Sequence, residues 1–394
     1  MSFQHYNDPV IQKSNAPVIQ QSKPKVLILG KLPPPHYGPA IATEILLKSN
    51  LRTYYALYHL DTGTHESLLT FGQWSWKNFF KNIGLYVRFV FLILRHWPDL
   101  ILIPISQATL PLMKDSIFIL LSRLFCRRTV LQLRGSNFKN LLNAMWPLTR
   151  FYISLILRRT QGVIVLGNKL RFLFEEYFSP GQIFVVPNGA NYHFTPPEKN
   201  GRVPRVLHLT NLQSSKGIED VIEAARILKN DSETRFHLDV VGAWRDEKTR
   251  SKCLKIANDH RLPITFYPPA DANEKFKFLA HADIFVFTPR APEGHPWVIV
   301  EALAAGLPVI STDQGAIAES VIDGVNGFIV ATQNPRQLAE KITVLLDNPD
   351  LKKQMGLASG RLYMENFTED KMVQRLRICF DTLLHKNENV NITK

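Results

Sequence analysis

The first half of the chain alternates short apolar runs with amphipathic stretches. Buried strands are predicted from apolar, β-branched runs at 25–30, 100–105, 129–135, 162–167 and 183–189. A helical pattern follows the first run, from Ala40 to Leu47, and further helical stretches fill the gaps. Strands that are apolar throughout and alternate with helices are typical of a parallel sheet covered on both faces.

A second series of the same kind begins after a proline-rich connection at 195–204. Its strands are predicted at 206–210, 236–242, 264–268, 284–289, 308–313 and 327–330, and an amphipathic helix from about 369 to 384 ends the pattern. A chain of 394 residues is too long for one ordinary core. The pattern therefore predicts two doubly wound α/β units, a first domain at 24–198 and a second at 199–366, followed by a helix and polar tail at 367–394.

Several sequence features disfavour a secreted, membrane-spanning or disulfide-linked protein. Residues 1–23 are polar, repeat PVIQ and predict a disordered arm without an apolar secretory segment. No window of 18 apolar residues without a charge is present, which disfavours a membrane-spanning helix. Cys126, Cys253 and Cys379 lie far apart and form no C-x-x-C pair, so we expect a reducing, cytoplasmic compartment and neither a disulfide framework nor a zinc site.

Positive charge is concentrated in the first domain. The whole chain has a formal net charge of +13, and residues 71–160 contain thirteen Lys or Arg and two Asp. Four of the six tryptophans (Trp74, Trp76, Trp97 and Trp146) lie in the same window. Mixed aromatics, aliphatics and cations at near-helical spacing are typical of helices at a membrane interface, although solvated core helices would give a similar pattern. We therefore expect peripheral association with the inner face of the cell membrane, and no nucleic-acid binding, because no reader motif is present.

Charged residues follow the predicted strands of the second domain, where ligands bind in open parallel sheets. Lys216 stands at the start of a helix, where a cation is unfavourable unless an anion is bound there. Glu293 lies just before, and Glu301 about one turn inside, a helix predicted at 297–305. The two carboxylates suit hydrogen bonds from sugar and ribose hydroxyls, and the amides of the first turn suit a pyrophosphate. These residues could also have purely structural roles. Lys216 would then be a solvated loop lysine, and Glu293 and Glu301 would only stabilise the N-terminus of the helix.

The segment that begins at Glu293 resembles the retaining family 4 glycosyltransferases of the GT-B fold, in which two Rossmann-like domains face each other. The family pattern of two glutamates separated by seven residues, followed by Ala-x-x-x-Gly-x-Pro-Val, stands here as Glu293-GHPWVIV-Glu301-ALAAGLPV. The match continues through Glu319 to the turn at 323–327. The Lys216-Gly217 pair, the segment at 185–189 and the strand at 282–286 also resemble family features, and the last helix resembles the one that crosses back to the first domain.

The resemblance implies transfer of a sugar from a nucleoside diphosphate donor to a glycan or lipid-linked saccharide, with retention at the anomeric carbon. It implies no cofactor and no metal, and the sequence contains no Asp-x-Asp pair. Lys216 and Glu293 are the expected catalytic residues, and Glu301 is expected to bind ribose. The other expected donor-site residues are Gly38, Thr210, Asn211, Gly242, Phe266, Tyr267, Pro268, Gly294, His295, Pro296 and Trp297. Gln132 and Arg134 are candidates on the acceptor side. A membrane location suggests assembly of cell-surface polysaccharide or lipopolysaccharide.

Departures from the family pattern keep other functions open. The pair Thr210-Asn211 stands where relatives have Gly-Arg, so one phosphate clamp is weakened or is replaced by Arg134 or Arg290. A GT-B sugar-nucleotide epimerase and a non-catalytic, membrane-associated partner with this fold are therefore alternatives. A nicotinamide-dependent oxidoreductase is disfavoured, because the chain contains no G-x-G.

Overall fold

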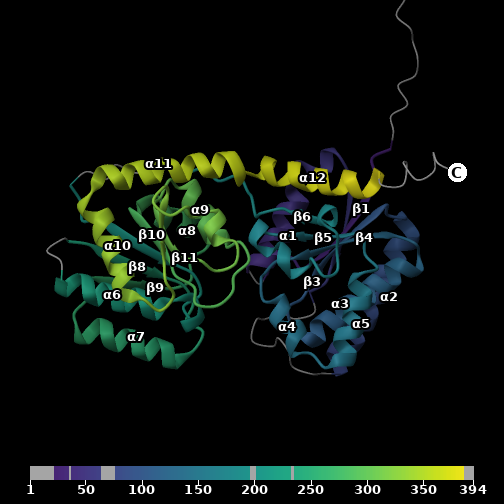
Figure 1. Ribbon diagram of the computed structural model, residues 1–394, viewed down its shortest axis with the longest axis horizontal. Coiled ribbons are helices and arrows are strands. Elements are labelled where there is room, and N and C mark those ends of the chain that lie inside the picture. Colours follow the sequence, from purple (N-terminus) through teal and green to yellow (C-terminus); the bar gives the residue numbers. More distant parts are fainter. Residues whose placement is uncertain (1–21, 35–36, 64–75, 196–200, 232–234, 386–394) are drawn as a thin grey trace, which may run out of the picture.

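The computed structural model describes residues 22–34, 37–63, 76–195, 201–231 and 235–385. The predicted arm lies outside the described residues except for its last two positions, as do Trp74, part of the connection at 195–204 and the polar tail at 386–394. The described residues form two α/β units, each built on a six-stranded sheet (Figure 1).

All strand pairs of the first sheet are parallel, in the order β2-β1-β3-β4-β5-β6. The strands are β1 (Lys25–Gly30), β2 (Ala56–Asp61), β3 (Leu100–Ile105), β4 (Arg128–Leu133), β5 (Gly162–Val165) and β6 (Ile183–Val185). The sequence pattern did not predict β2, because this edge strand is only half-buried and its sequence, ALYHLD, mixes polar and apolar positions. Predicted strands β4 and β6 are shorter than expected, since their Gly- and Pro-containing ends turn into the loops beside the second unit.

Two layers of helices cover the first sheet. One face packs against α2 (Trp76–His96), α3 (Thr109–Leu124), α4 (Phe138–Ala144) and α5 (Pro147–Leu157) in a core that includes Phe89, Phe118 and Ile153. The other face packs against α1 (Gly38–Lys48) and α12 (Glu369–His385). Helix α3 contacts both α2 and α5, so these three helices lie side by side on one outer surface (Figure 1).

The second sheet is also parallel, in the order β12-β11-β10-β7-β8-β9. The strands are β7 (Arg205–Leu209), β8 (His237–Val241), β9 (Ile264–Tyr267), β10 (Ile284–Phe287), β11 (Val309–Thr312) and β12 (Gly327–Val330). Each was predicted within one or two residues, because buried central strands are continuous apolar runs. One face is covered by α6 (Ile218–Asp231), α7 (Glu247–Asp259) and α10 (Pro335–Asp347), and the other by α8 (Ala272–His281) and α9 (Trp297–Ala304).

The last two helices of the described structure connect the two units. Helix α11 (Pro349–Asn366) runs along the second unit, and α12 continues across to the first (Figure 1). The apolar stripe of α12, which includes Leu376 and Phe380, is buried with residues of β1, β3 and β4. A helix with one apolar stripe is stable only when that stripe is covered, so the first sheet holds α12 in place. Among the described residues, no helix is both long and apolar enough to span a bilayer.

Candidate functional site

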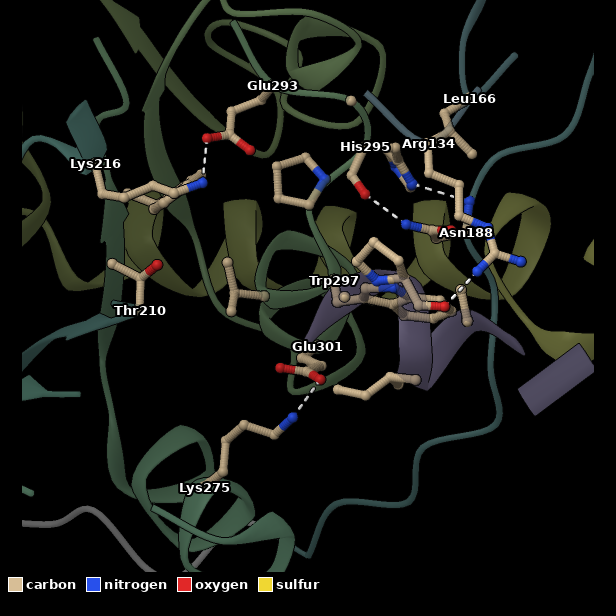
Figure 2. A pocket seen from close by; sticks show the side chains of 18 residues that line it. Arg134, Leu166, Asn188, Thr210, Lys216, Lys275, Glu293, His295, Trp297 and Glu301 are labelled. Atoms are coloured by element: carbon tan, nitrogen blue, oxygen red, sulfur yellow. Dashed lines mark hydrogen bonds and ion pairs between the residues drawn. The ribbon is translucent and has the colours of Figure 1, made fainter. Parts of the chain in front are cut away.

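A cavity of about 300 Å³ lies between the two units (Figure 2). Its first wall comes from the loop after β1 with the start of α1, the loop after β4 and the end of β5. Its second wall comes from the ends of β7 and β10, the loop before α9, and residues of α8 and α9. The carboxyl ends of both sheets therefore meet at one cavity, the place where open parallel sheets bind ligands.

Lys216 and Glu293 meet in this cavity as an ion pair. The Lys216 Nζ donates a hydrogen bond to the Glu293 carboxylate from the short helix η5 (Ser214–Lys216) (Figure 2). Burial raises the pKa of Glu293, and the neighbouring Lys216 opposes that rise. The loop that carries Glu293 is held by Gly315, whose positive φ of 62° brings its backbone against the Glu293 carbonyl, where a Cβ would stand 1.6 Å from the oxygen. The sequence placed both residues in one site, and the structure brings them together.

Glu301 lies in α9, one turn from its start, and its side chain is almost fully buried beside the cavity. Its Oε1 accepts a hydrogen bond from the Lys275 ammonium at 2.5 Å and one from the Tyr192 hydroxyl at 3.4 Å. Its Oε2 is buried and has no hydrogen-bond partner in the described structure. A buried carboxylate oxygen without a donor is costly, so this oxygen is suited to accept a hydrogen bond from a bound ligand.

Two helices begin at the cavity from opposite sides. Helix α1 starts at Gly38 in the first unit and α9 starts at Trp297 in the second, and neither has a side chain that caps its N-terminus. A Cβ added at Gly38 would lie 3.5 Å from the Trp297 ring, which shows how closely the two helix ends approach. Free amides and the helix dipole favour an anion at such ends.

The first unit also contributes Arg134, from the loop after β4. Its Nη1 donates to the Pro39 carbonyl and, at 2.9 Å, to the Thr43 hydroxyl, and its Nε donates to Gln132 at 3.0 Å. Burial lowers the pKa of Arg134 to about 10, so it remains a cation at neutral pH. Gln132 itself is buried behind Arg134 and does not line the cavity.

Contacts around His295 join the two units. Its Nδ1 accepts from the backbone N–H of Asn188 at 3.1 Å, and the Asn188 side-chain amide donates to the His295 carbonyl at 2.6 Å. Its Nε2 lies 2.7 Å from the Ser320 hydroxyl. Because Nδ1 is an acceptor, the ring is neutral, and burial lowers the pKa of His295 to about 3. Next to it, Gly294 packs against the Arg134 carbonyl, where a Cβ would stand 2.8 Å away.

Glu319 makes a second contact between the units. Its carboxylate accepts from the backbone N–H groups of Asn168 and Lys169, at 2.9 and 2.7 Å, at the start of the short helix η3 (Asn168–Leu173). The Lys169 ammonium in turn binds Asp313 at 2.8 Å. The loops that follow β5 and β11 are thereby held against each other beside the cavity.

Most of the predicted donor-site residues line the cavity, but not all of them do. Those that line it are Gly38, Thr210, Lys216, Glu293, Gly294, His295, Pro296, Trp297 and Glu301. Those outside its lining are Asn211, Gly242, Phe266, Tyr267 and Pro268. The Phe266 ring packs on Trp244 and the Tyr267 ring on Phe278, so both side chains pack against residues of their own unit.

Arg290, expected as a possible second phosphate clamp, has other partners. Its guanidinium binds Asp220 at 2.6 Å and Glu219 at 2.7 Å, and it does not line the cavity. Arg134 lines the cavity and is the better placed of the two candidates. Lys275 was not predicted from the sequence, because one lysine in the polar helix segment NEKFK gives no signal by itself. Asn188 and Leu166 were not predicted as site residues either, because they reach the site only through the approach of the two units.

Comparisons with known proteins agree with this geometry. Residues 192–359 match the family model of the glycosyl transferases group 1. An uncharacterized glycosyltransferase of Methanocaldococcus jannaschii is 26% identical over 64% of this chain and 68% of its own length. A poly(ribitol-phosphate) alpha-N-acetylglucosaminyltransferase of Staphylococcus aureus is 24% identical over 57% of this chain, which spans only 44% of that relative.

Solved structures show the same fold. Anabaena HepE, solved in complex with UDP, superimposes with a TM-score of 0.71 at 18% identity over 91% of this chain and all of that protein. Sucrose-phosphate synthase of Thermosynechococcus elongatus gives a TM-score of 0.71 at 18% identity over 92% of this chain and 99% of its own. The second unit is therefore similar to the glycosyl transferases group 1, and the two units together have the GT-B fold.

Proposed function

We propose that this protein transfers a sugar from a nucleoside diphosphate to a glycan or lipid-linked saccharide, with retention of configuration at the anomeric carbon. The observation that carries the proposal is the meeting of Lys216, the partly buried Glu293, the buried Glu301 and two uncapped helix ends at one cavity between the sheets. HepE, which has the same fold, is seen with UDP and with UDP-glucose, and this supports a nucleotide-sugar donor here.

The anionic part of the donor fits between the helix ends. In the structure, Lys216 is paired with Glu293. A diphosphate bound at the starts of α1 and α9 would draw the Lys216 ammonium to its oxygens and free the Glu293 carboxylate to accept hydrogen bonds from sugar hydroxyls. Lys216 and the helix amides then stabilise the charge that develops on the leaving diphosphate.

Retention constrains the chemistry of the transfer. The bond between the anomeric carbon and the diphosphate oxygen breaks, and its electron pair leaves with the diphosphate. The acceptor hydroxyl forms the new bond on the same face, so its proton can pass to the departing diphosphate oxygen. Lys216, Arg134 and the two helix ends supply positive charge on that side, which supports a reaction without a metal ion.

The ribose is assigned to Glu301, whose buried Oε2 has no donor in the described structure. A vicinal diol supplies hydroxyl donors, whereas a phosphate oxygen would be repelled by the carboxylate. This orders the donor along the cavity, with the nucleoside near α8 and α9, the diphosphate near Lys216 and the sugar near Glu293.

The test is the release of nucleoside diphosphate from UDP-glucose, UDP-N-acetylglucosamine, GDP-mannose and ADP-glucose, in the presence and absence of a chelator. We expect release from at least one donor, undiminished by the chelator, and a product whose anomeric NMR signal keeps the donor configuration. Glu293→Gln is the matched variant and should lower the rate sharply. Inverted product, or complete loss with the chelator, contradicts the proposed mechanism.

The same experiment separates the alternative functions. An epimerase would release a free sugar or epimer when no acceptor is added. A non-catalytic partner would release nothing from any donor and would not bind nucleoside diphosphates at millimolar concentrations.

We also propose that the first unit docks on an anionic membrane at the cytoplasmic face, through an outer surface made by α2, α3 and α5. Exposed apolar side chains on this surface include Trp146 (78% exposed), Phe151 (70%), Phe91, Leu124 and Leu148. Exposed arginines alternate with them at Arg88, Arg95, Arg123, Arg150 and Arg158. The one acid within these three helices, Asp115, is hydrogen-bonded to the Ser106 amide.

Apolar side chains next to cations, with few acids, match an anionic bilayer better than a neutral one. Each cation near such a surface contributes about 1 kcal/mol, and buried apolar area adds to this. A lipid-linked acceptor would then be presented at the same surface, as expected for the assembly of cell-surface polysaccharide.

Flotation with vesicles tests the docking surface. We expect the protein to float with phosphatidylglycerol-containing vesicles at low salt and less with phosphatidylcholine alone. A triple variant, Trp146→Ser, Leu148→Ser and Phe151→Ser, should stay at the bottom. A control with three exposed apolar residues of α11 and α12 changed, Leu357→Ser, Met364→Ser and Ile378→Ser, should float like the unchanged protein. Equal flotation of both variants, or none for the unchanged protein, contradicts this surface.

A further inference from the structure

The family resemblance supplies no role for Lys275, a charged residue that lines the cavity. It stands in the first turns of α8 and reaches the cavity, where its ammonium binds Glu301 Oε1 at 2.5 Å (Figure 2). We infer that Lys275 is a positioning residue that fixes the Glu301 carboxylate, so that recognition of the nucleotide's ribose hydroxyls depends on it. This inference rests on the proposed function and names the determinant of selectivity at its nucleoside end.

The two oxygens of Glu301 are in different situations. Oε1 accepts hydrogen bonds from Lys275 and from the Tyr192 hydroxyl. Oε2 is buried without any partner in the described structure. The side chain is 3% exposed, so water does not compensate for the missing donor. Two donors on one oxygen fix the rotation of the carboxylate, and this leaves Oε2 to the ligand.

The Lys275 ammonium also compensates for the desolvation of the buried Glu301 carboxylate. A carboxylate buried without its cation is strongly destabilised, because it loses its hydration without a compensating charge. The Tyr192 hydroxyl alone would supply only a longer, neutral hydrogen bond, at 3.4 Å. The pair therefore allows an ionised acceptor to sit at the nucleoside end of the cavity, where a neutral side chain would bind hydroxyls less strongly.

The position of the pair separates its role from that of Lys216. Lys216 pairs with Glu293, on the loop before α9, whereas Lys275 pairs with Glu301, inside α9. A diphosphate that draws Lys216 away from Glu293 leaves the Lys275 pair in place. Lys275 therefore acts on the binding of the ribose hydroxyls, and Lys216 acts on the binding of the diphosphate and on how fast the sugar is transferred.

The experiment compares binding of a ribonucleotide with binding of its 2′,3′-dideoxy counterpart. Whichever of UDP, GDP and ADP binds most tightly is titrated by calorimetry, together with its dideoxy form, into the unchanged protein, Lys275→Met, Lys275→Arg and Lys277→Met. Lys277 is exposed on the same helix and serves as the control. The readout is the ratio of the two dissociation constants. A general loss of stability would weaken the binding of both nucleotides alike and would leave this ratio unchanged.

We expect the unchanged protein to prefer the ribonucleotide by about 10-fold or more, the size of a hydrogen bond to a charged group. Lys275→Met should bring the ratio close to one, Lys275→Arg should keep most of it, and Lys277→Met should leave it unchanged. If Lys275→Met does not fold, Lys275→Met with Glu301→Gln removes the unpaired charge and should also give a ratio near one.

The inference is overturned if Lys275→Met, or the double variant in its place, keeps the full preference. It is also overturned if the unchanged protein shows no preference while it binds the ribonucleotide. Failure of the unchanged protein to bind any of the three nucleoside diphosphates instead overturns the proposed function itself.

Discussion

The two sides of the cleft are built on the same kind of six-stranded parallel sheet, yet they bring different chemistry to it. The second unit supplies both lysine–glutamate pairs, Lys216–Glu293 and Lys275–Glu301. The first unit supplies a helix end, Arg134 and backbone groups that close on the loop before α9. Its most distinctive surface faces away from that contact, on α2, α3 and α5. The difference teaches that one fold can carry the proposed donor contacts on one side of the cleft and the proposed docking surface on the other.

The largest expected effect comes from removing the charge on the second side. Lys216→Ala should lower kcat by about 10²–10³, the loss typical of one charged contact to a developing anion. Arg134→Gln, on the first side, should lower it less, because three of its hydrogen bonds go to neighbouring groups of its own unit. Steady-state kinetics with the best donor measure both. Equal losses would contradict the unequal roles of the two sides.

An intermediate effect is expected in the dependence of stability on pH. The folded pKa of His295 is lowered to about 3, so between pH 6.5 and 3 the unfolded chain binds a proton that the folded chain does not. Stability should therefore fall as the pH drops through this window, by up to about 1.4 kcal/mol per pH unit from this group.

Urea unfolding at pH 7, 6 and 5 measures this contribution. His295→Gln should show a shallower loss of unfolding free energy on acidification than the unchanged protein. His281→Gln, which changes an exposed histidine of α8, is the control and should keep the original slope. Identical slopes for all three proteins would show that the His295 contact between the units does not control acid stability.

The smallest effect is expected at the rim of the cleft. Glu319→Gln removes the charge from a side chain that accepts hydrogen bonds from two backbone N–H groups of the other unit. The contact between the two units should weaken by about 1 kcal/mol, and the KM for the donor should rise a few-fold. Asp313→Asn, which breaks an exposed ion pair with Lys169, should change the KM less. Small-angle scattering would report whether the Glu319 variant is more open. A larger rise in KM for Asp313→Asn than for Glu319→Gln would contradict the greater importance of the Glu319 contact.

The sequence predicts the second side of the cleft far better than the first. The strands of the second sheet are mostly apolar, and Glu293 and Glu301 follow one of them closely along the chain, so both the fold and the site could be predicted. Strand β2 was missed, because an edge strand needs no continuous apolar run. Lys275 was missed because its partner lies 26 residues away along the chain. Asn188 and Leu166 reach the site only when the units meet, which no local pattern records.

The proposed function requires that the cleft bind a nucleoside diphosphate through charges on the second unit. Calorimetric titration of UDP, GDP and ADP into the unchanged protein and Lys216→Ala tests it most directly. We expect saturable binding of at least one nucleotide below millimolar concentration, and binding about 10-fold or more weaker in the variant. Heat that is absent for all three nucleotides, or equal affinity in the two proteins, would contradict it.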